Sequence, residues 1–312
     1  MNQQSPRPAP VWVRMVASVV RRLPAGRYRA IQRIGRDAAP PFLMEMPVEL
    51  GGGTYLCDLR DDIAREVCFT GLYGPQETAL VRALLAPGDT FVDVGANWGY
   101  FTLLAASLVG QGGRVLSLEP DPRLFPVLEA NVARNGLRHV TLRQLAAAGG
   151  PGILALAGFD EAAGNFGVSR IVPDAAADGR TFRVRADALD RILDEEGIRR
   201  VDLLKMDIEG AEGAALAGLE ESLRGGRVAR LLVELHPVEL AEHGTSTDAL
   251  VDTLRSAGYT GYTVSHDPAV TRAAAYGRAS SLRELLRPLE PGEPLDAWPH
   301  QLWCAPGSEL RW

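Results

Sequence analysis

Lysine is almost missing from this chain of 312 residues: Lys205 is the only one, and arginine supplies the rest of the 33 basic residues. Together with the abundance of alanine and glycine, this indicates a GC-rich coding sequence. Basic residues are outnumbered, and the formal net charge of −6 excludes a general nucleic-acid binder, which carries a basic surface. A small-molecule or peptide substrate fits this composition better.

Long hydrophobic runs are also lacking. No stretch approaches the roughly 18 apolar residues that cross a bilayer, which excludes a transmembrane protein. The apolar stretch at 11–22 is short and ends in Arg21 and Arg22, whereas a signal peptide has its positive charges before the apolar region. We therefore expect an amphipathic helix that lies on the domain, or that touches a membrane surface weakly.

Cysteine is scarce. Cys57, Cys68 and Cys304 are odd in number, widely spaced and without a CxxC pair. Such a set predicts free thiols in a reducing compartment, and hence a cytoplasmic protein. A disulfide between Cys57 and Cys68 is the alternative.

What the sequence has in plenty is an alternation of strands and helices. Apolar strand segments are expected near 90–94, 114–118, 139–145, 201–206, 230–235, 259–264 and 301–304. Because helical segments separate most of them, the pattern predicts a parallel α/β sheet with helices on both faces. We divide the chain into an N-terminal extension (1–70: flexible tail, helix and a small β-hairpin within 49–69) and a main domain (71–312) with an insertion near 150–186.

The turn after the first of these strands has the features of a nucleoside site. Gly95 and Gly99 allow a tight turn and close approach of a ligand. Asn97 stands where a dinucleotide fingerprint has its middle glycine, which favours a ligand without pyrophosphate. Glu119 ends the next strand, where a carboxylate accepts hydrogen bonds from ribose hydroxyls, and Asp93 is placed to bond the ammonium group of a methionyl moiety. The alternative is that Asp93 and Glu119 are only polar strand ends and that Asn97 caps a helix.

A second group of charges follows the fourth strand. Asp207 and Glu209 lie at its carboxyl end, beside the first turn, and Lys205 is a candidate partner for them. Buried charges are costly unless they are paired or used. For Glu212 the main alternative is a favourable interaction with a helix N-terminus.

The fifth strand ends in a carboxylate and an imidazole. Glu234 lies inside this apolar strand and His236 at its end. Carboxyl ends of parallel strands line one crevice, so His236 is either a catalytic residue or a structural histidine in that crevice.

These motifs resemble the FkbM family of methyltransferases. The matching segments are DVGANWGYFT at 93–102, LEP at 118–120, KMDIEGAE at 205–212 and VELH at 233–236. The resemblance implies a Rossmann-like class I methyltransferase with a mostly parallel seven-stranded sheet, and S-adenosylmethionine as methyl donor. Asp93, Gly95, Asn97, Gly99 and Glu119 then bind this cofactor. Where many methyltransferases have an acidic residue near the adenine, this chain has Gln144–Ala147, so backbone or apolar contacts are expected there.

The resemblance also implies an oxygen acceptor, which needs help because an alcohol is a poor nucleophile. His236 is the preferred general base, since imidazole titrates near neutral pH. Asp207 and Glu209 are alternatives, either as base or as ligands of a divalent cation. Asn165, Ser169 and Glu209 are candidate substrate contacts. Asn165 and Ser169 lie in the segment 158–178, and the alternative is that this segment is an ordinary flexible loop.

The predicted function is O-methylation of a hydroxyl on a secondary metabolite or sugar. Methylation of a carboxylate on a peptide or small molecule is the alternative, and it needs no base. A noncatalytic nucleoside-binding protein and a nicotinamide-dependent oxidoreductase remain as rivals; the glycine spacing at Gly95 and Gly99 counts against the oxidoreductase.

Overall fold

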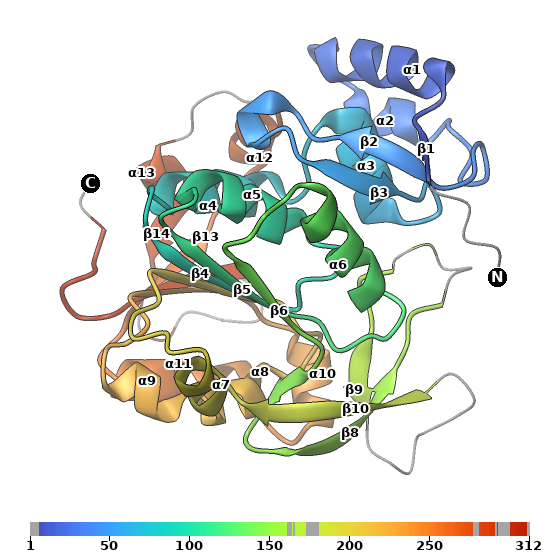
Figure 1. Ribbon diagram of the computed structural model, residues 1–312. Coiled ribbons are helices and arrows are strands. Elements are labelled where there is room, and N and C mark those ends of the chain that lie inside the picture. Colours follow the sequence, from blue (N-terminus) through green and yellow to red (C-terminus); the bar gives the residue numbers. More distant parts are fainter. Residues whose placement is uncertain are drawn as a thin grey trace.

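An eight-stranded sheet forms the centre of the computed structural model, which describes residues 6–160, 164, 166–172, 181–276, 281–290, 292 and 300–310 (Figure 1). The strand order is β14-β13-β15-β12-β11-β4-β5-β6. The strands are β4 (Thr90–Val94), β5 (Arg114–Leu118), β6 (Val140–Arg143), β11 (Leu203–Met206), β12 (Arg230–Glu234), β13 (Thr260–Val264), β14 (Leu286–Pro288) and β15 (His300–Cys304).

The parallel part of this sheet runs through β6, β5, β4, β11 and β12, and β15 enters antiparallel between β12 and β13. The mostly parallel seven-stranded sheet is confirmed, and the short β14 adds an eighth strand beside β13. The order reverses between β4 and β11, because β5 and β6 lie on one side of β4 and the later strands on the other. Ligands bind at such a reversal in open parallel sheets.

Helices cover both faces of the sheet (Figure 1). On one side lie α4 (Pro75–Leu84), α5 (Tyr100–Val109) and α6 (Phe125–Arg134), and on the other α7 (Leu189–Glu195), α8 (Glu212–Ala217), α9 (Glu220–Arg224), α10 (Pro237–Glu242) and α11 (Thr247–Ser256). Side chains alternate between two cores: Phe91 and Leu203 pack in the first, Val92 and Leu204 in the second. This alternation follows from the period of two in a strand.

The N-terminal part forms a small sheet of its own. It contains β1 (Arg7–Pro8), β2 (Phe42–Glu45) and β3 (Thr54–Cys57), with α1 (Val11–Arg22), α2 (Arg27–Ile31), α3 (Asp62–Thr70) and a short 3-10 turn at Val48–Leu50. The amphipathic helix predicted at 11–22 is confirmed as α1, which buries Val13, Ala17 and Val20.

The hairpin expected within 49–69 is wrong in its second half. β3 pairs with β2, which precedes that window, and the residues from Asp62 onward form α3. The carboxylate of Asp61 accepts hydrogen bonds from the backbone N–H groups of Ile63 and Ala64, so it caps the helix. An aspartate before an apolar run with helical spacing is an N-cap signal that decides against a strand.

Helix α6 ties β3 to the turn after β4. The Oδ1 of Asn131 accepts from the Leu56 N–H at 2.9 Å, while its Nδ2 donates to the Trp98 carbonyl at 2.8 Å. Tyr55 of β3 also stacks on Trp98, with ring centroids 4.8 Å apart. The N-terminal unit therefore supports the turn in which a cofactor is expected.

A second, four-stranded sheet follows β6, in the order β7-β10-β8-β9. Its strands are β7 (Ala146–Ala148), β8 (Gly152–Ala157), β9 (Arg170–Val172) and β10 (Thr181–Ala188). Two further helices, α12 (Pro268–Ala275) and α13 (Leu282–Leu285), follow β13. Asn165, proposed above as a substrate contact, lies outside the described residues.

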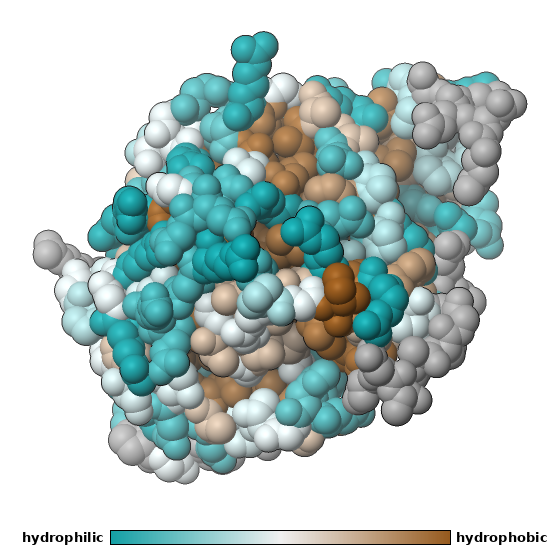
Figure 2. Space-filling view, turned by 60° about the horizontal axis from the view of Figure 1, so that its bottom comes forward, coloured by the Kyte–Doolittle hydropathy of each residue, from teal (hydrophilic) through white to brown (hydrophobic). Residues whose placement is uncertain are grey.

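The polarity of the surface and the state of the cysteines are as expected from the composition of the sequence. Figure 2 shows hydrophilic residues over much of one face, with apolar residues in separate patches among them. Within the described ranges, no helix is both long and apolar enough to span a bilayer. Cys57, Cys68 and Cys304 are all buried and unpaired, so the prediction of free thiols is confirmed and the alternative Cys57–Cys68 disulfide is wrong.

Candidate active site

A pocket opens at the carboxyl ends of β4, β5 and β11, where the strand order reverses. It brings together four groups of residues: the turn after β4, the end of β5, the start of the insertion sheet and the turn after β11. Its lining includes Gly95, Asn97, Glu119, Leu145, Asp207 and Glu209. The first and fourth strand ends, expected to meet from their positions in the sequence, therefore line one cavity.

The two glycines of the first turn allow close packing within the protein. Both have positive φ, 84° for Gly95 and 101° for Gly99. A Cβ on Gly95 would lie 2.0 Å from the carbonyl oxygen of Asp207, and one on Gly99 would lie 2.6 Å from Leu128 Cδ1. Gly95 lines the pocket and lets the turns after β4 and β11 approach each other. Gly99 is not among the described residues that line the pocket.

Asn97 and Glu119 form the polar edge of the pocket. Asn97 adopts a left-handed φ of 54°, and its backbone N–H donates to Glu119 Oε2 at 2.8 Å. Helix α5 begins at Tyr100, and within the described structure the Asn97 side chain does not cap it; its Oδ1 accepts from the Trp98 N–H. Asn97 thus shapes the turn and points a backbone donor at Glu119.

Glu119 retains capacity to bind a ligand. Its Oε1 accepts from the Asp121 N–H at 2.8 Å, so each carboxylate oxygen holds one backbone donor and keeps a second lone pair. Burial raises the pKa of Glu119 to about 7. These free lone pairs, together with the apolar wall of Leu145, Ala146 and Ala147, fit the ribose and base of a nucleoside.

Lys205 lies between two acidic groups. It is paired in register with Asp93 on β4, and its Nζ is 3.3 Å from Asp207 Oδ2, so the predicted pairing is confirmed. Its ammonium also lies 4.9 Å from the centroid of the Phe101 ring. Burial opposes the charge of Lys205, but Asp207 and Asp93 raise its pKa, which keeps the amine protonated.

Asp93 lies deeper than its proposed role suggests. Its carboxylate is 1% exposed and accepts from Thr102 Oγ1 at 2.7 Å, and it is not among the described lining residues of the pocket. Burial raises the pKa of Asp93, and Lys205 opposes that rise. The structure therefore places Asp93 as a support for Lys205, and its contact with a methionyl ammonium stays a prediction.

One polar group at this edge was missed from the sequence. Asp121 accepts three hydrogen bonds from Arg123 and one, of 2.6 Å, from Ser169 Oγ in the insertion. Although burial opposes it, this bonding lowers the pKa of Asp121. Asp121, two residues before Arg123, is a turn signal that the sequence shows. Its hydrogen bond to Ser169 could not be predicted, because the two residues are 48 positions apart. Ser169 is thereby placed in the pocket wall.

His236 is held by Glu212. Its Nδ1 lies 2.9 Å from Glu212 Oε1, and Glu212 is fully buried. The other ring nitrogen faces Glu209 Oε2 at 3.5 Å and Asp207 Oδ1 at 4.0 Å. Burial alone would lower the pKa of His236, but the bond to Glu212 and the surrounding carboxylates raise it to about 9.

The bond to Glu212 and the neighbouring carboxylates favour the protonated form of the imidazole. The role of His236 as general base gains no support from these surroundings and stays a prediction. Glu209 is better suited to act as a general base near neutral pH. Burial raises the pKa of Glu209 to about 7, although His236 acts in the opposite direction. Glu209 also has a left-handed φ of 52°, an unusual conformation for a side chain of its size.

Asp207, Glu209 and His236 are also close enough to share a cation. One ligand atom from each lies within 4.8 Å of the others. Glu212 on Nδ1 directs the second nitrogen of His236 toward the carboxylates, an arrangement that commonly orients metal-binding histidines. The donor set fits a divalent cation.

Comparison with known proteins gives the family. Residues 93–260 match the methyltransferase FkbM domain. The 31-O-demethyl-FK506 methyltransferase FkbM of Streptomyces tacrolimicus is 30% identical over 56% of this chain and 74% of its own length. The antimetabolite synthetase AmbE of Pseudomonas aeruginosa is 29% identical over 56% of this chain, which spans only 10% of that protein.

The solved structure of a methyltransferase FkbM from Methylobacillus flagellatus is 16% identical to this chain. The match covers 78% of this chain and 55% of that one, with a TM-score of 0.43. The domain match extends from Asp93 to Thr260 and so includes the turns after β4, β5 and β11 that line the pocket. The chain therefore belongs to the FkbM methyltransferase family, whose cofactor is S-adenosylmethionine.

Proposed function

We propose that this chain transfers a methyl group from S-adenosylmethionine to a hydroxyl oxygen of a small molecule, a secondary metabolite or a sugar. One observation carries this proposal: a single pocket is lined both by the cofactor turn, with Gly95, Asn97 and Glu119, and by the acidic residues Asp207 and Glu209. A donor held at the first group faces proton-accepting side chains at the second.

When bound, S-adenosylmethionine supplies an electrophilic methyl group on a sulfonium centre. The chain's own contribution to that step is positioning. Glu119 accepts hydrogen bonds from the ribose hydroxyls, and Leu145 to Ala147 provide an apolar wall for the base. Lys205 fixes Asp207 at the opposite side of the pocket.

Glu209 is the proposed general base. It lines the pocket, and its pKa of about 7 allows it to exist as a carboxylate while still holding a proton once it has accepted one. With the cofactor bound, Glu209 would take the proton of the acceptor hydroxyl, whose oxygen would gain the methyl group as the bond from that methyl to sulfur breaks. His236 stays cationic next to Glu209, and Glu212 holds its ring in place.

A divalent cation at Asp207, Glu209 and His236 is the second candidate for activating the acceptor. It is supported by the mutual approach of their ligand atoms within 4.8 Å. A cation there would lower the pKa of a coordinated hydroxyl and so replace the base. A carboxylate acceptor on a peptide or small molecule would need neither.

The relatives support oxygen as the acceptor atom only by analogy. The Streptomyces tacrolimicus protein is named for methylation of an oxygen of FK506. The buried free thiols support a reducing compartment, and we place the reaction in the cytoplasm on that ground.

Labelled methyl transfer tests the proposal. The purified chain is incubated with methyl-labelled S-adenosylmethionine and extracts of the source organism, and calorimetry measures S-adenosylhomocysteine binding. We expect binding and labelling of a small molecule, with Glu209→Gln retaining binding but losing at least about hundredfold in rate. Loss of the wild-type rate on chelation, restored by an added divalent cation, would support the cation route. Absence of cofactor binding would overturn the proposal, and binding without transfer to any acceptor would indicate a noncatalytic protein.

A further inference from the structure

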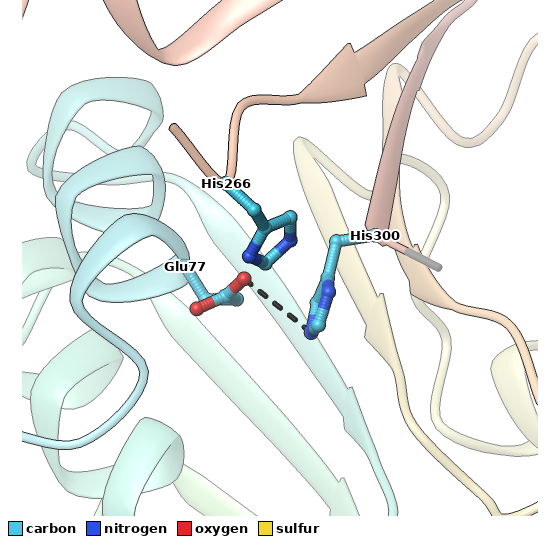
Figure 3. A group of neighbouring side chains, drawn as sticks. All are labelled: Glu77, His266 and His300. Atoms are coloured by element: carbon cyan, nitrogen blue, oxygen red, sulfur yellow. Dashed lines mark ion pairs between the residues drawn. The ribbon is translucent and has the colours of Figure 1, made fainter. Parts of the chain in front are cut away.

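A second cluster of ligand-type side chains lies outside the pocket described above. Glu77 comes from α4, His266 from the loop after β13 and His300 from the start of β15. Figure 3 shows the three side chains directed toward one another, and one ligand atom from each lies within 4.8 Å of the others. Three segments distant in the sequence thus converge on one point.

The spacing is close to that of a metal site. His300 Nε2 lies 3.4 Å from Glu77 Oε1 and 3.0 Å from Glu234 Oε2. Ligands about 2.1 Å from a tetrahedral Zn²⁺ are separated from one another by about 3.4 Å. One ligand atom of His266 lies within 4.8 Å of those of Glu77 and His300, so a small displacement would complete a set of three.

Burial leaves the polar groups of this cluster unsatisfied. Glu77 is 8% exposed, and within the described structure its Oε1 accepts no hydrogen bond; its contact there is the 3.4 Å ion pair with His300 Nε2. The Nδ1 of His300 is likewise buried without a hydrogen-bond partner in the described structure. A buried carboxylate and an imidazole without full hydrogen bonding cost free energy, and a bound cation would remove that cost for the carboxylate.

The cluster is both anchored and accessible. Gln76, next to Glu77, donates from Nε2 to the Ser265 carbonyl at 3.2 Å and to Thr271 Oγ1 at 2.6 Å. These bonds fix α4 to the loop that carries His266. His266 itself is exposed, so an ion could enter from solvent without opening the core.

We propose that Glu77, His266 and His300 bind one divalent transition-metal ion. Two imidazoles and one carboxylate form a ligand set that suits Zn²⁺ and leaves a fourth position open. Glu234 already lies beside His300. It would either accept a hydrogen bond from the His300 imidazole or bind the ion as a further carboxylate. The ion would join α4 to the antiparallel edge of the sheet.

This site is distinct from the candidate cation site in the pocket. Glu234 lies between the two, with its Oε1 3.9 Å from His236 Nε2, and none of Glu77, His266 and His300 is among the described lining residues of the pocket. Binding to the two sites can therefore be separated by substitution. The alternative for Glu77 and His300 is a plain ion pair with no metal.

Metal titration of the full chain tests the proposal without reference to methyl transfer. The protein is stripped with a chelator and titrated with Zn²⁺ by calorimetry, and with Co²⁺ by visible absorption, in a Asp207→Asn/His236→Ala background that disables the pocket cluster. We expect one Zn²⁺ per chain and the intense visible bands of low-coordinate Co²⁺. His266→Ala and Glu77→Gln should each weaken binding by at least about tenfold.

His243 provides the matched control, because it is an exposed histidine at the end of α10. His243→Ala should leave Zn²⁺ binding unchanged. Circular dichroism of each variant checks folding; His266 is exposed and Glu77→Gln is isosteric, so both variants should fold. The proposal is overturned if the background protein binds no Zn²⁺, or if His266→Ala and Glu77→Gln bind it as tightly as His243→Ala does.

Discussion

Glu119 and Glu209 are two carboxyl groups whose pKa burial raises to about 7, yet their surroundings give them different tasks. Glu119 receives two backbone N–H donors, which fix its orientation for hydrogen bonding. Glu209 faces a cationic imidazole and an acidic neighbour, which suit it to taking up a proton. At the scale of single residues, partners decide the role more than pKa does.

Cofactor affinity should depend on pH through Glu119. Ribose hydroxyls donate to the carboxylate form, so binding should weaken as the pH falls from 8 through about 7, where Glu119 takes up a proton. Glu119→Gln should weaken S-adenosylhomocysteine binding by about tenfold or more at pH 8 and flatten its pH dependence. Calorimetry between pH 6 and 8 measures both, with Glu129→Gln on the exposed side of α6 as control. An unchanged pH profile in Glu119→Gln would contradict this role.

Replacing Lys205 by methionine should destabilise the fold by about 3 kcal/mol. The change leaves Asp93 buried and without its cationic neighbour. Urea unfolding of Lys205→Met, Asp93→Asn and the double variant measures the effect. The second substitution should recover part of the loss, because it removes the uncompensated charge. Strictly additive losses would show that the two side chains do not interact.

Local signals made the cofactor turn predictable. Gly95, Asn97 and Glu119 are separated by short, characteristic intervals, and strand ends in a parallel sheet must meet at one edge. The protonation of His236 could not be predicted, because it depends on a bond to Glu212 across 24 positions and on the burial of both. The cluster of Glu77, His266 and His300 depends on three separate elements and left no sequence pattern.

The turn between β4 and α5 tolerates no side chain at Gly95 without displacement of its neighbours. Gly95→Ala should abolish S-adenosylhomocysteine binding, because the new methyl group would meet the Asp207 carbonyl at 2.0 Å. Gly88→Ala is the matched control: its φ is also positive, 93°, but the space around it is open. Gly88→Ala should lose about 1 kcal/mol of stability to backbone strain, and Gly95→Ala should lose more because of the added clash, as measured by thermal unfolding. Equal binding by the two variants would show that the close approach at Gly95 is unimportant.

Helix α1 presents an apolar face to solvent, with Val11, Trp12, Met15 and Val19 exposed. The first 36 residues contain eight arginines and no acidic residue. We propose that this helix binds weakly to anionic membrane surfaces. Co-sedimentation should detect binding to phosphatidylserine vesicles at low salt, lost on Trp12→Ser/Met15→Ser or at high salt. Equal binding to uncharged vesicles would contradict the electrostatic part, and no binding at low salt would contradict the proposal.

At the scale of the whole molecule, one hydrophobic core extends from α1 through α5 to the far strands of the sheet. The alternation of strands and helices was enough to predict the class of the sheet, because it reflects local periodicity. The extension at 1–70 has no such pattern, and its packing on α6 depends on Asn131 and Tyr55.

Removing residues 1–58 should therefore leave the rest unable to hold the cofactor turn. Trp98 would lose its stacking partner Tyr55, and the core face of α5 would be exposed. We expect the shortened chain to aggregate or to bind S-adenosylhomocysteine at least about tenfold more weakly, by loss of about 1.4 kcal/mol or more. Calorimetry measures the binding and size-exclusion chromatography the aggregation. A stable, fully binding fragment would show that residues 1–58 are an independent extension.

The single lysine also has a practical consequence. Lys205 is 6% exposed, lines the pocket and has its ammonium beside Asp207, so amine-directed reagents can reach it only through the pocket. Apart from the α-amino group of the chain, no other amine competes for such a reagent. The extent of acylation at Lys205 would then report, at one atom, whether the pocket is empty or filled.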